Sequence, residues 1–272
     1  MIENTENPSP FFGIGTKYAM NMHGLYVLNN TIGTMADEYD KKHSSAFVET
    51  METWKKKASE SGLIKMEKDG NGNEIIAVDD CITDPNIVYL KELAQCCKAL
   101  TKAAPNQRDL LQKSALMLIT TYYESLIADI YNIYYRKNPC AIPGENRNIS
   151  LGELLKLGKI EDAVGIVIER EINSFLRESL SRQMSILRDR HKIDFNGMTS
   201  IVNECIEIDQ RRNIHVHNMG VANSIYIDNV DPELIARHGV ENGKELGISS
   251  EYLNNSIGSF QNFGILLLLS LW

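Results

Sequence analysis

The residues of this sequence best suited to chemistry lie in one stretch, IDQRRNIHVHNMG, which runs from residue 208 to residue 220. Seven residues of it contain two arginines, an asparagine and two histidines: Arg211, Arg212, Asn213, His215 and His217. A guanidinium binds phosphate oxygens through its planar set of donors, and a histidine exchanges a proton near neutral pH. These residue types at this spacing favour acid–base chemistry on a phosphate ester.

The segment that carries these residues predicts an amphipathic helix from about Met198 to Asn218, ended by a cap at Asn218 and Gly220. At 100° per residue, the apolar side chains fall in one arc, which we expect to be buried: Ile201, Val202, Cys205, Ile206 and Ile208. Arg212 and Asn213 fall in this arc, and His217 lies at its edge in the last turn, where the helix dipole favours a positive charge.

The two adjacent arginines are therefore expected to differ. Arg211 follows Glu207 by four residues on the opposite side of the helix, which predicts a solvated surface pair. Arg212 points toward the dry side, where an unpaired guanidinium costs several kcal/mol. A carboxylate, a partner subunit or a ligand anion must meet it, and a purely structural ion pair is an equal alternative to a functional site.

The rest of the chain predicts a mainly all-α protein with one small β-hairpin. Helical spacing covers residues 18–61 as one or two helices, and Asp-Gly-Asn-Gly between two apolar runs predicts the hairpin that follows. After residue 85 the pattern is almost wholly helical, so we place a domain boundary there, between residues 1–85 and residues 86–272. The helical stretches are expected over residues 86–103, 106–137, 151–157, 160–190 (one long helix or a broken pair), 198–218 and a last helix near the C-terminus.

Composition limits the classes of function. A formal net charge of −8 over 272 residues argues against coating nucleic acid by bulk electrostatics, although a local phosphate site remains compatible with it. No signal peptide or membrane-spanning run is evident, and five cysteines without a CxxC pair favour reduced thiols in a cytoplasmic protein. His215 and His217 have no Cys or His partner pair at metal-site spacing, so we expect no metal and no cofactor.

The pattern Arg212-Asn213-x-x-x-His217 resembles the Arg-polar-x(3–5)-His motif of the HEPN superfamily, the higher eukaryotes and prokaryotes nucleotide-binding domains. The surrounding RRNIHVHNMGVANSIYI looks particularly like the HEPN ribonucleases of prokaryotic toxin and defence systems. The stretch TTYYESLIADIY resembles the earlier helix of that family, with Tyr123-Glu124 as its aromatic–Glu pair. The likeness covers roughly residues 86–272.

This resemblance implies a HEPN-like helical bundle, here with an N-terminal helical extension that contains the hairpin. It implies a metal-independent endoribonuclease, a toxin or an antiviral abortive-infection effector, in which the RNA 2'-hydroxyl attacks the adjacent phosphorus. By position, His217 would be the general acid or base, Arg212 would stabilise the phosphoryl oxygens, and Asn213 would orient Arg212 or the scissile group. Glu124 would be the fourth site residue. The implied partners are RNA, a second copy of the chain, and an antitoxin or another defence-system component.

Other interpretations stay open. A non-catalytic HEPN module in a defence complex could bind a nucleotide or a protein through the same residues. A third hypothesis is a helical adaptor whose first 85 residues bind a partner. Glu124 lies opposite the main apolar face of its helix, so it also fits a solvated glutamate. Basic residues exceed acidic ones between Glu169 and Lys192, which fits either RNA binding or an ordinary helix surface.

Overall fold

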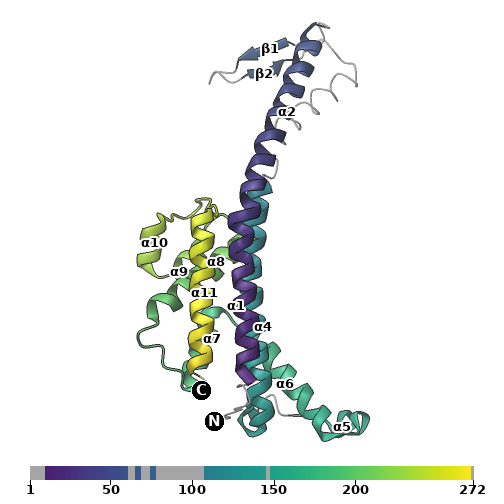
Figure 1. The fold of residues 1–272 in the computed structure, drawn as a ribbon, viewed down its shortest axis with the longest axis vertical. Coiled ribbons are helices and arrows are strands. Elements are labelled where there is room, and N and C mark those ends of the chain that lie inside the picture. Colours follow the sequence, from purple (N-terminus) through teal and green to yellow (C-terminus); the bar gives the residue numbers. More distant parts are fainter. Residues whose placement is uncertain (1–9, 61–64, 69–73, 78–106, 145–147, 271–272) are drawn as a thin grey trace, which may run out of the picture. The chain divides into compact units, whose positions relative to one another are not determined.

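The structure of the protein, a computed structural model, is predominantly helical (Figure 1). The residues that it describes are 10–60, 65–68, 74–77, 107–144 and 148–270. The backbone divides into two units. The larger one comprises Met1–Thr31 and Leu111–Trp272, and the smaller one comprises Ile32–Leu110. Among the helices of the described residues, none combines the length and the apolar character needed to cross a membrane.

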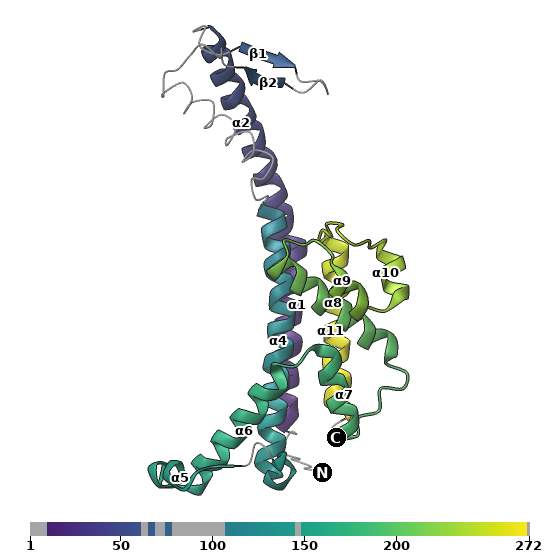
Figure 2. The same cartoon turned by 180° about the vertical axis from the view of Figure 1, so that it is seen from behind.

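Helices from both ends of the chain build the core of the larger unit. These are α1 (Pro10–Val27), α4 (Gln107–Lys137, apart from its first turn), α7 (Leu180–His191), α8 (Thr199–His217) and α11 (Ser250–Ser270). α11 packs along α1 and against α8 (Figure 1 and Figure 2). The Tyr18 hydroxyl donates a hydrogen bond of 2.6 Å to the carbonyl oxygen of Phe260, which ties α1 to α11 inside this core.

A second, smaller core lies on the other side of α8. It contains α9 (Ser224–Asn229), α10 (Pro232–His238) and the chain up to Leu246, and the α8 residue Ile214 belongs to it. Asp231 caps α10 by accepting a 2.8 Å hydrogen bond from the Glu233 amide. α8 is therefore covered on two sides, which decides the environment of its charged residues.

The predicted helices of the C-terminal part have the expected limits where the structure describes them. α4 and α8 agree with the predicted ranges to within a residue or so, and α5 (Leu151–Leu157) begins at the capping box of Ser150 and ends at Gly158, φ +72°. A 3₁₀ turn, Pro139–Ala141, follows α4. Residues 160–190 form the broken pair, α6 (Ile160–Leu176) and α7, because Ser179 starts a new helix by capping the Arg182 amide at 3.3 Å.

Residues 18–61 also form two helices. α1 passes through a π-helical turn, Leu28–Ile32, into α2 (Gly33–Glu60). Within the smaller unit, β1 (Lys65–Lys68) pairs antiparallel with β2 (Glu74–Ala77). The turn expected between these strands, the helix expected over residues 86–103 and the expected boundary at residue 85 all lie outside the described residues. α1, which that boundary would assign to the N-terminal segment, packs in the main core.

Candidate functional site

α8 carries the Arg-Asn-x-x-x-His motif and ends directly after it. The amides of Asn218 and Gly220 both donate to the Ile214 carbonyl oxygen, at 2.8 and 3.0 Å, and Gly220 adopts φ +81°. A Cβ at Gly220 would lie 2.7 Å from the imidazole ring of His215. A glycine is therefore needed here both for the backbone and for the histidine ring packed against it.

The prediction that Arg211 and Glu207 form a solvated surface pair is wrong. The two do pair, with 2.8 Å between Arg211 Nε and Glu207 Oε1, but Arg211 is 5% exposed and Glu207 is 2% exposed. The reason is the second core. It covers the side of α8 that we expected to face solvent, because the apolar residues of the helix lie in one arc on the other side. The buried charges are matched, as burial requires.

Two tyrosines complete the partners of this ion pair. Tyr226 donates to Glu207 Oε1 at 2.5 Å, and Tyr252 donates to Glu207 Oε2 at 2.8 Å. The Arg211 guanidinium lies 4.2 Å from the ring centre of Tyr252 and donates to the Gly247 carbonyl oxygen at 3.3 Å. Burial, followed by the charge of Glu207, raises the pKa of both tyrosine hydroxyls, which therefore remain protonated donors.

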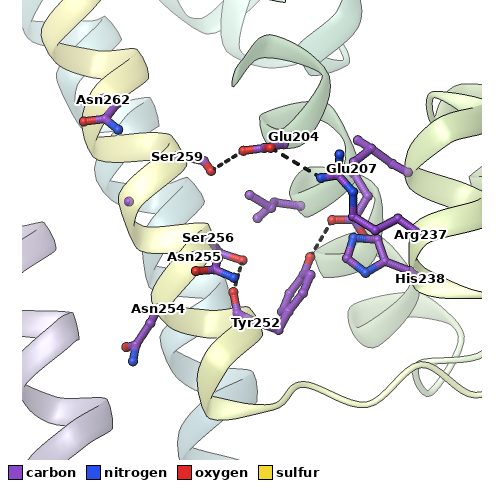
Figure 3. Close-up of a pocket in the computed structure, with 13 residues that line it drawn as sticks. Glu204, Glu207, Arg237, His238, Tyr252, Asn254, Asn255, Ser256, Ser259 and Asn262 are labelled. Atoms are coloured by element: carbon purple, nitrogen blue, oxygen red, sulfur yellow. Dashed lines mark hydrogen bonds and ion pairs between the residues drawn. The ribbon is translucent and has the colours of Figure 1, made fainter. Parts of the chain in front are cut away.

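A polar pocket of about 430 Å³ opens beside this network, between α8, α10 and α11 (Figure 3). We call it the Glu204 pocket. Glu204 accepts a 2.7 Å hydrogen bond from Ser259 and lies 3.6 Å from Arg237. Figure 3 also shows the Tyr252 hydroxyl directed at Glu207, which lies deeper in the protein. The acidic groups of this pocket therefore already have partners.

The motif arginine lines a different cavity, of about 300 Å³, which we call the Arg212 pocket. Four regions form it: α4, the junction of α6 with α7, α8 and α11. Its lining residues are Thr120, Tyr123, Glu124, Leu176, Arg177, Glu178, Ser179, Leu180, Gln183, Asp209, Arg212, Asn213 and Phe260. Three of the four predicted site residues, Arg212, Asn213 and Glu124, are thus together in one cavity.

Arg212 is held by its neighbour and is only partly satisfied. Its Nη1 donates to Asn213 Oδ1 at 2.9 Å, and Asn213 Nδ2 donates to Asp209 Oδ2 at 3.4 Å. The Nε atom of Arg212 is buried and has no hydrogen-bond partner among the described residues. The HEPN resemblance implies two possible roles for Asn213, and the contact with Arg212 corresponds to one of them.

Two carboxyl groups share the pocket with Arg212. Burial raises the pKa of Asp209 to about 6; the charge of Glu124 acts in the same direction, while Arg212 and the hydrogen bond from Asn213 oppose it. Burial likewise raises the pKa of Glu124, again opposed by Arg212. Asp209 was not among the predicted site residues, although its position three and four residues before Arg212 and Asn213 places it on their face of the helix.

His217 lies apart from the pocket. It is exposed in the last turn of α8 and does not line the cavity. Its neighbours in the chain include two exposed apolar residues, Val216 at 44% and Met219 at 88% of full exposure. Within one chain, the predicted acid–base group and the predicted anion-binding group therefore do not face a common cavity.

Comparisons with protein-family models, with curated proteins and with solved structures find nothing that matches this chain. The described residues contain no group of three or more His, Cys, Asp or Glu side chains placed to hold a metal ion. The groups available for chemistry are a guanidinium held by the amide of Asn213, two carboxyl groups in the same cavity, and an exposed histidine at the end of the helix.

Proposed function

We propose that this protein is a metal-independent endoribonuclease of the HEPN type. The observation that carries the proposal is the Arg212 pocket, in which a guanidinium with an unused buried donor meets Asn213 and Glu124. These residues come from two helices far apart in the sequence, and they are the ones that the HEPN resemblance indicates. The guanidinium uses only Nη1 in its hydrogen bond to Asn213, so Nη2 is available to a phosphate oxygen.

The proposed reaction is an internal transesterification. A bond forms between the 2'-oxygen and the phosphorus, and the bond from the phosphorus to the 5'-oxygen breaks. A base takes the proton of the 2'-hydroxyl, and an acid gives a proton to the departing 5'-oxygen. His217 supplies an imidazole for one of these transfers, and Arg212 stabilises the negative charge that develops on the phosphoryl oxygens. The products are a 2',3'-cyclic phosphate and a 5'-hydroxyl.

A second copy of the chain would complete the site. Each chain contributes one His217, which lies outside its own Arg212 pocket, whereas the reaction needs both a base and an acid. The exposed apolar residues around His217, Met219 above all, suit a symmetric interface that brings two such helix ends together. The active species is accordingly a homodimer with a composite site.

Such an activity fits a toxin or an abortive-infection effector acting on RNA in the cytoplasm. An intracellular ribonuclease harms its host unless it is restrained, so an antitoxin or another defence-system component is a suitable partner. Residues 1–85 lie outside the resemblance and are the proposed sensor or docking segment. Removing them would then change toxicity or its triggering.

The alternative function is a non-catalytic module that binds a nucleotide or a protein. One observation favours it: His217 does not line the cavity that contains Arg212. If no second chain supplies the missing group, the pocket can bind a ligand but lacks a proton-transfer group of the required kind. The two functions therefore differ in whether His217 matters.

The test is expression of the wild type and of the His217→Ala and Arg212→Ala variants in a bacterial host, with the total RNA examined for cuts. We expect cleavage by the wild type, also in excess chelator, and a loss of about a hundredfold to a thousandfold in each variant. His23→Ala and Arg136→Ala, which alter exposed residues elsewhere, are the matched controls. Cleavage that needs a divalent ion, or full activity without His217, contradicts the proposal.

A further inference from the structure

The carboxyl groups of the Arg212 pocket have acceptor atoms that the protein does not use. Glu124 accepts no hydrogen bond among the described residues, and Asp209 uses only Oδ2, in a long contact of 3.4 Å. Burial raises the pKa of both groups, and the opposing charge of Arg212 compensates for this only in part. Acceptors placed in this way at a cavity suit a ligand that brings its own N–H groups.

A phosphate group would not suit this part of the pocket. Its lining includes Glu178 as well as Glu124 and Asp209, three carboxyl groups against the two guanidiniums of Arg177 and Arg212. Like charges repel an incoming anion most strongly where water is scarce. The part of the pocket beside these carboxyl groups is therefore better suited to a neutral group that is rich in donors.

A nucleobase has this character, and the hydrogen-bonding pattern selects one. Guanine presents an acceptor followed by two donors on its Watson–Crick edge: O6, N1–H and the N2 amino group. Cytosine and adenine each offer there a single amino group, and uracil offers a single N–H between two oxygens. Only guanine gives a carboxylate two adjacent donors and still leaves an oxygen for a guanidinium.

The lining of the pocket also has a suitable composition. Leu176, which is half-buried, and Leu180 form an apolar part of the wall against which a planar ring can lie. The Nη2 atom of Arg212 carries two N–H groups that can donate to O6 and to a phosphate oxygen, because the Nη1 atom is directed at Asn213 and Nε is buried. One guanidinium can in this way contact both a base and the phosphate attached to it.

We propose that the Arg212 pocket binds a guanine base of single-stranded RNA, with N1–H and the N2 amino group donating to Glu124. This inference rests on the proposed ribonuclease activity and specifies its substrate: cleavage occurs next to guanosine. Glu124 is then a specificity-determining residue, and Asp209 is an additional acceptor at its side.

The experiment separates recognition from cleavage. Short single-stranded DNA oligonucleotides lack the 2'-hydroxyl and cannot be cut, so their affinity for the full-length protein is measured by fluorescence anisotropy. Three oligonucleotides differ at one position, which is guanine, hypoxanthine (guanine without the N2 amino group) or adenine. We expect guanine to bind at least about tenfold more tightly than either of the others, because a hydrogen bond to a charged acceptor is lost.

The Glu124→Gln variant should lose this preference, because an amide offers one acceptor where the carboxylate offers two. Asp129→Asn, a similar change on the same helix at a residue that does not line the pocket, should keep it. Equal affinity for guanine and hypoxanthine, or no binding of any of the three, overturns the inference even if the protein cuts RNA. A guanine preference abolished by Glu124→Gln supports it even if cleavage is never detected, in which case the proposed ribonuclease activity fails separately.

Discussion

On one side of α8, Arg211 lies in a closed network in which every charged atom has a partner. On the other side, Arg212 lines a cavity, with a buried Nε that has none among the described residues. The two side chains are adjacent and of the same type. The difference between them lies in their surroundings. Glu207 of the same helix and the hydroxyls of Tyr226 and Tyr252 complete the network of Arg211. Arg212 instead faces the carboxyl groups of Asp209 and Glu124, which have few hydrogen-bond donors.

This contrast separates structural from functional use of the same residue type. A buried charge whose donors are all used holds a fold together and has nothing left with which to bind a ligand. A charge with unused donors next to a cavity costs stability, and the cost is tolerated where a ligand can make up for it. The comparison therefore predicts opposite responses to mutation on the two sides of α8.

The largest effect on stability is expected for Arg211→Met. The substitution leaves the carboxylate of Glu207 buried at 2% exposure without its cation, so we expect a loss of about 3–5 kcal/mol in the free energy of unfolding. Arg212→Met is the matched control and should change that free energy by less than about 1 kcal/mol. Urea denaturation of the three proteins at pH 7 measures both.

Removing the anion as well sharpens this prediction. The double variant Glu207→Gln/Arg211→Met has no unpaired buried charge, so it should be more stable than Arg211→Met alone. If the single Arg211 variant is as stable as the wild type, the network does not hold the structure together, and the contrast between the two arginines fails.

The sequence indicates the pairing of Glu207 with Arg211 but not where the pair lies. A four-residue spacing brings the two side chains together on any helix, and no periodicity within α8 reveals that a second core covers them. Tyr226 and Tyr252, which complete the network, are 15 and 41 residues further along than Arg211 in the chain. Which side of a helix is exposed depends on such distant segments, and one apolar arc is insufficient evidence when the helix packs on two sides.

Local signals were more informative about the elements themselves. The capping box at Ser150, the glycine at the end of α5 and the glycine at the end of α8 act through neighbouring atoms, so the sequence determines them directly. The residues of the Arg212 pocket could be predicted from the sequence only in part. Asn213 and Asp209 share a helix face with Arg212, whereas Glu124 arrives from α4 and was indicated only by the family resemblance.

An intermediate effect is expected at His191, which is half-buried among tyrosine rings. Its ring lies 5.2 Å from that of Tyr131 and 5.4 Å from that of Tyr134, and its Nε2 has no hydrogen-bond partner among the described residues. Burial, with help from the charge of Arg190, lowers the pKa of His191 to about 4. The folded protein therefore binds fewer protons than the unfolded chain between pH 6.5 and 4, and stability falls as the pH drops through this range.

His191→Gln should remove this acid sensitivity. Between pH 7 and pH 4.5 we expect the wild type to lose about 2 kcal/mol more than the variant, as measured by urea denaturation at the two pH values. His23→Gln, at an exposed histidine of α1, should follow the wild type. An identical pH dependence in the wild type and the His191 variant would mean that the imidazole is charged in the folded protein.

The smallest effect, and the one of opposite sign, is expected at Asp209 on the open side of α8. Its pKa of about 6 exceeds that of an ordinary aspartate, about 3.9, so the folded protein binds more protons than the unfolded chain between these values. The ionised carboxylate consequently destabilises the fold, and this destabilisation is fully present above pH 6 and disappears as the pH falls toward 4. Asp209→Asn should therefore raise the free energy of unfolding at pH 7 by about 1 kcal/mol, since the side chain is partly solvated.

The same substitution should have little stabilising effect at pH 4, where the Asp209 carboxyl group of the folded wild type is protonated and neutral. Asp129→Asn, at a residue of α4 outside the cavity, should leave stability at both pH values within about 0.5 kcal/mol of the wild type. A neutral asparagine that destabilises the protein at pH 7 would mean that Asp209 anchors Arg212 as firmly as Glu207 anchors Arg211. The two sides of α8 would then be equivalent, and the Arg212 pocket would have to be interpreted as part of the structural framework.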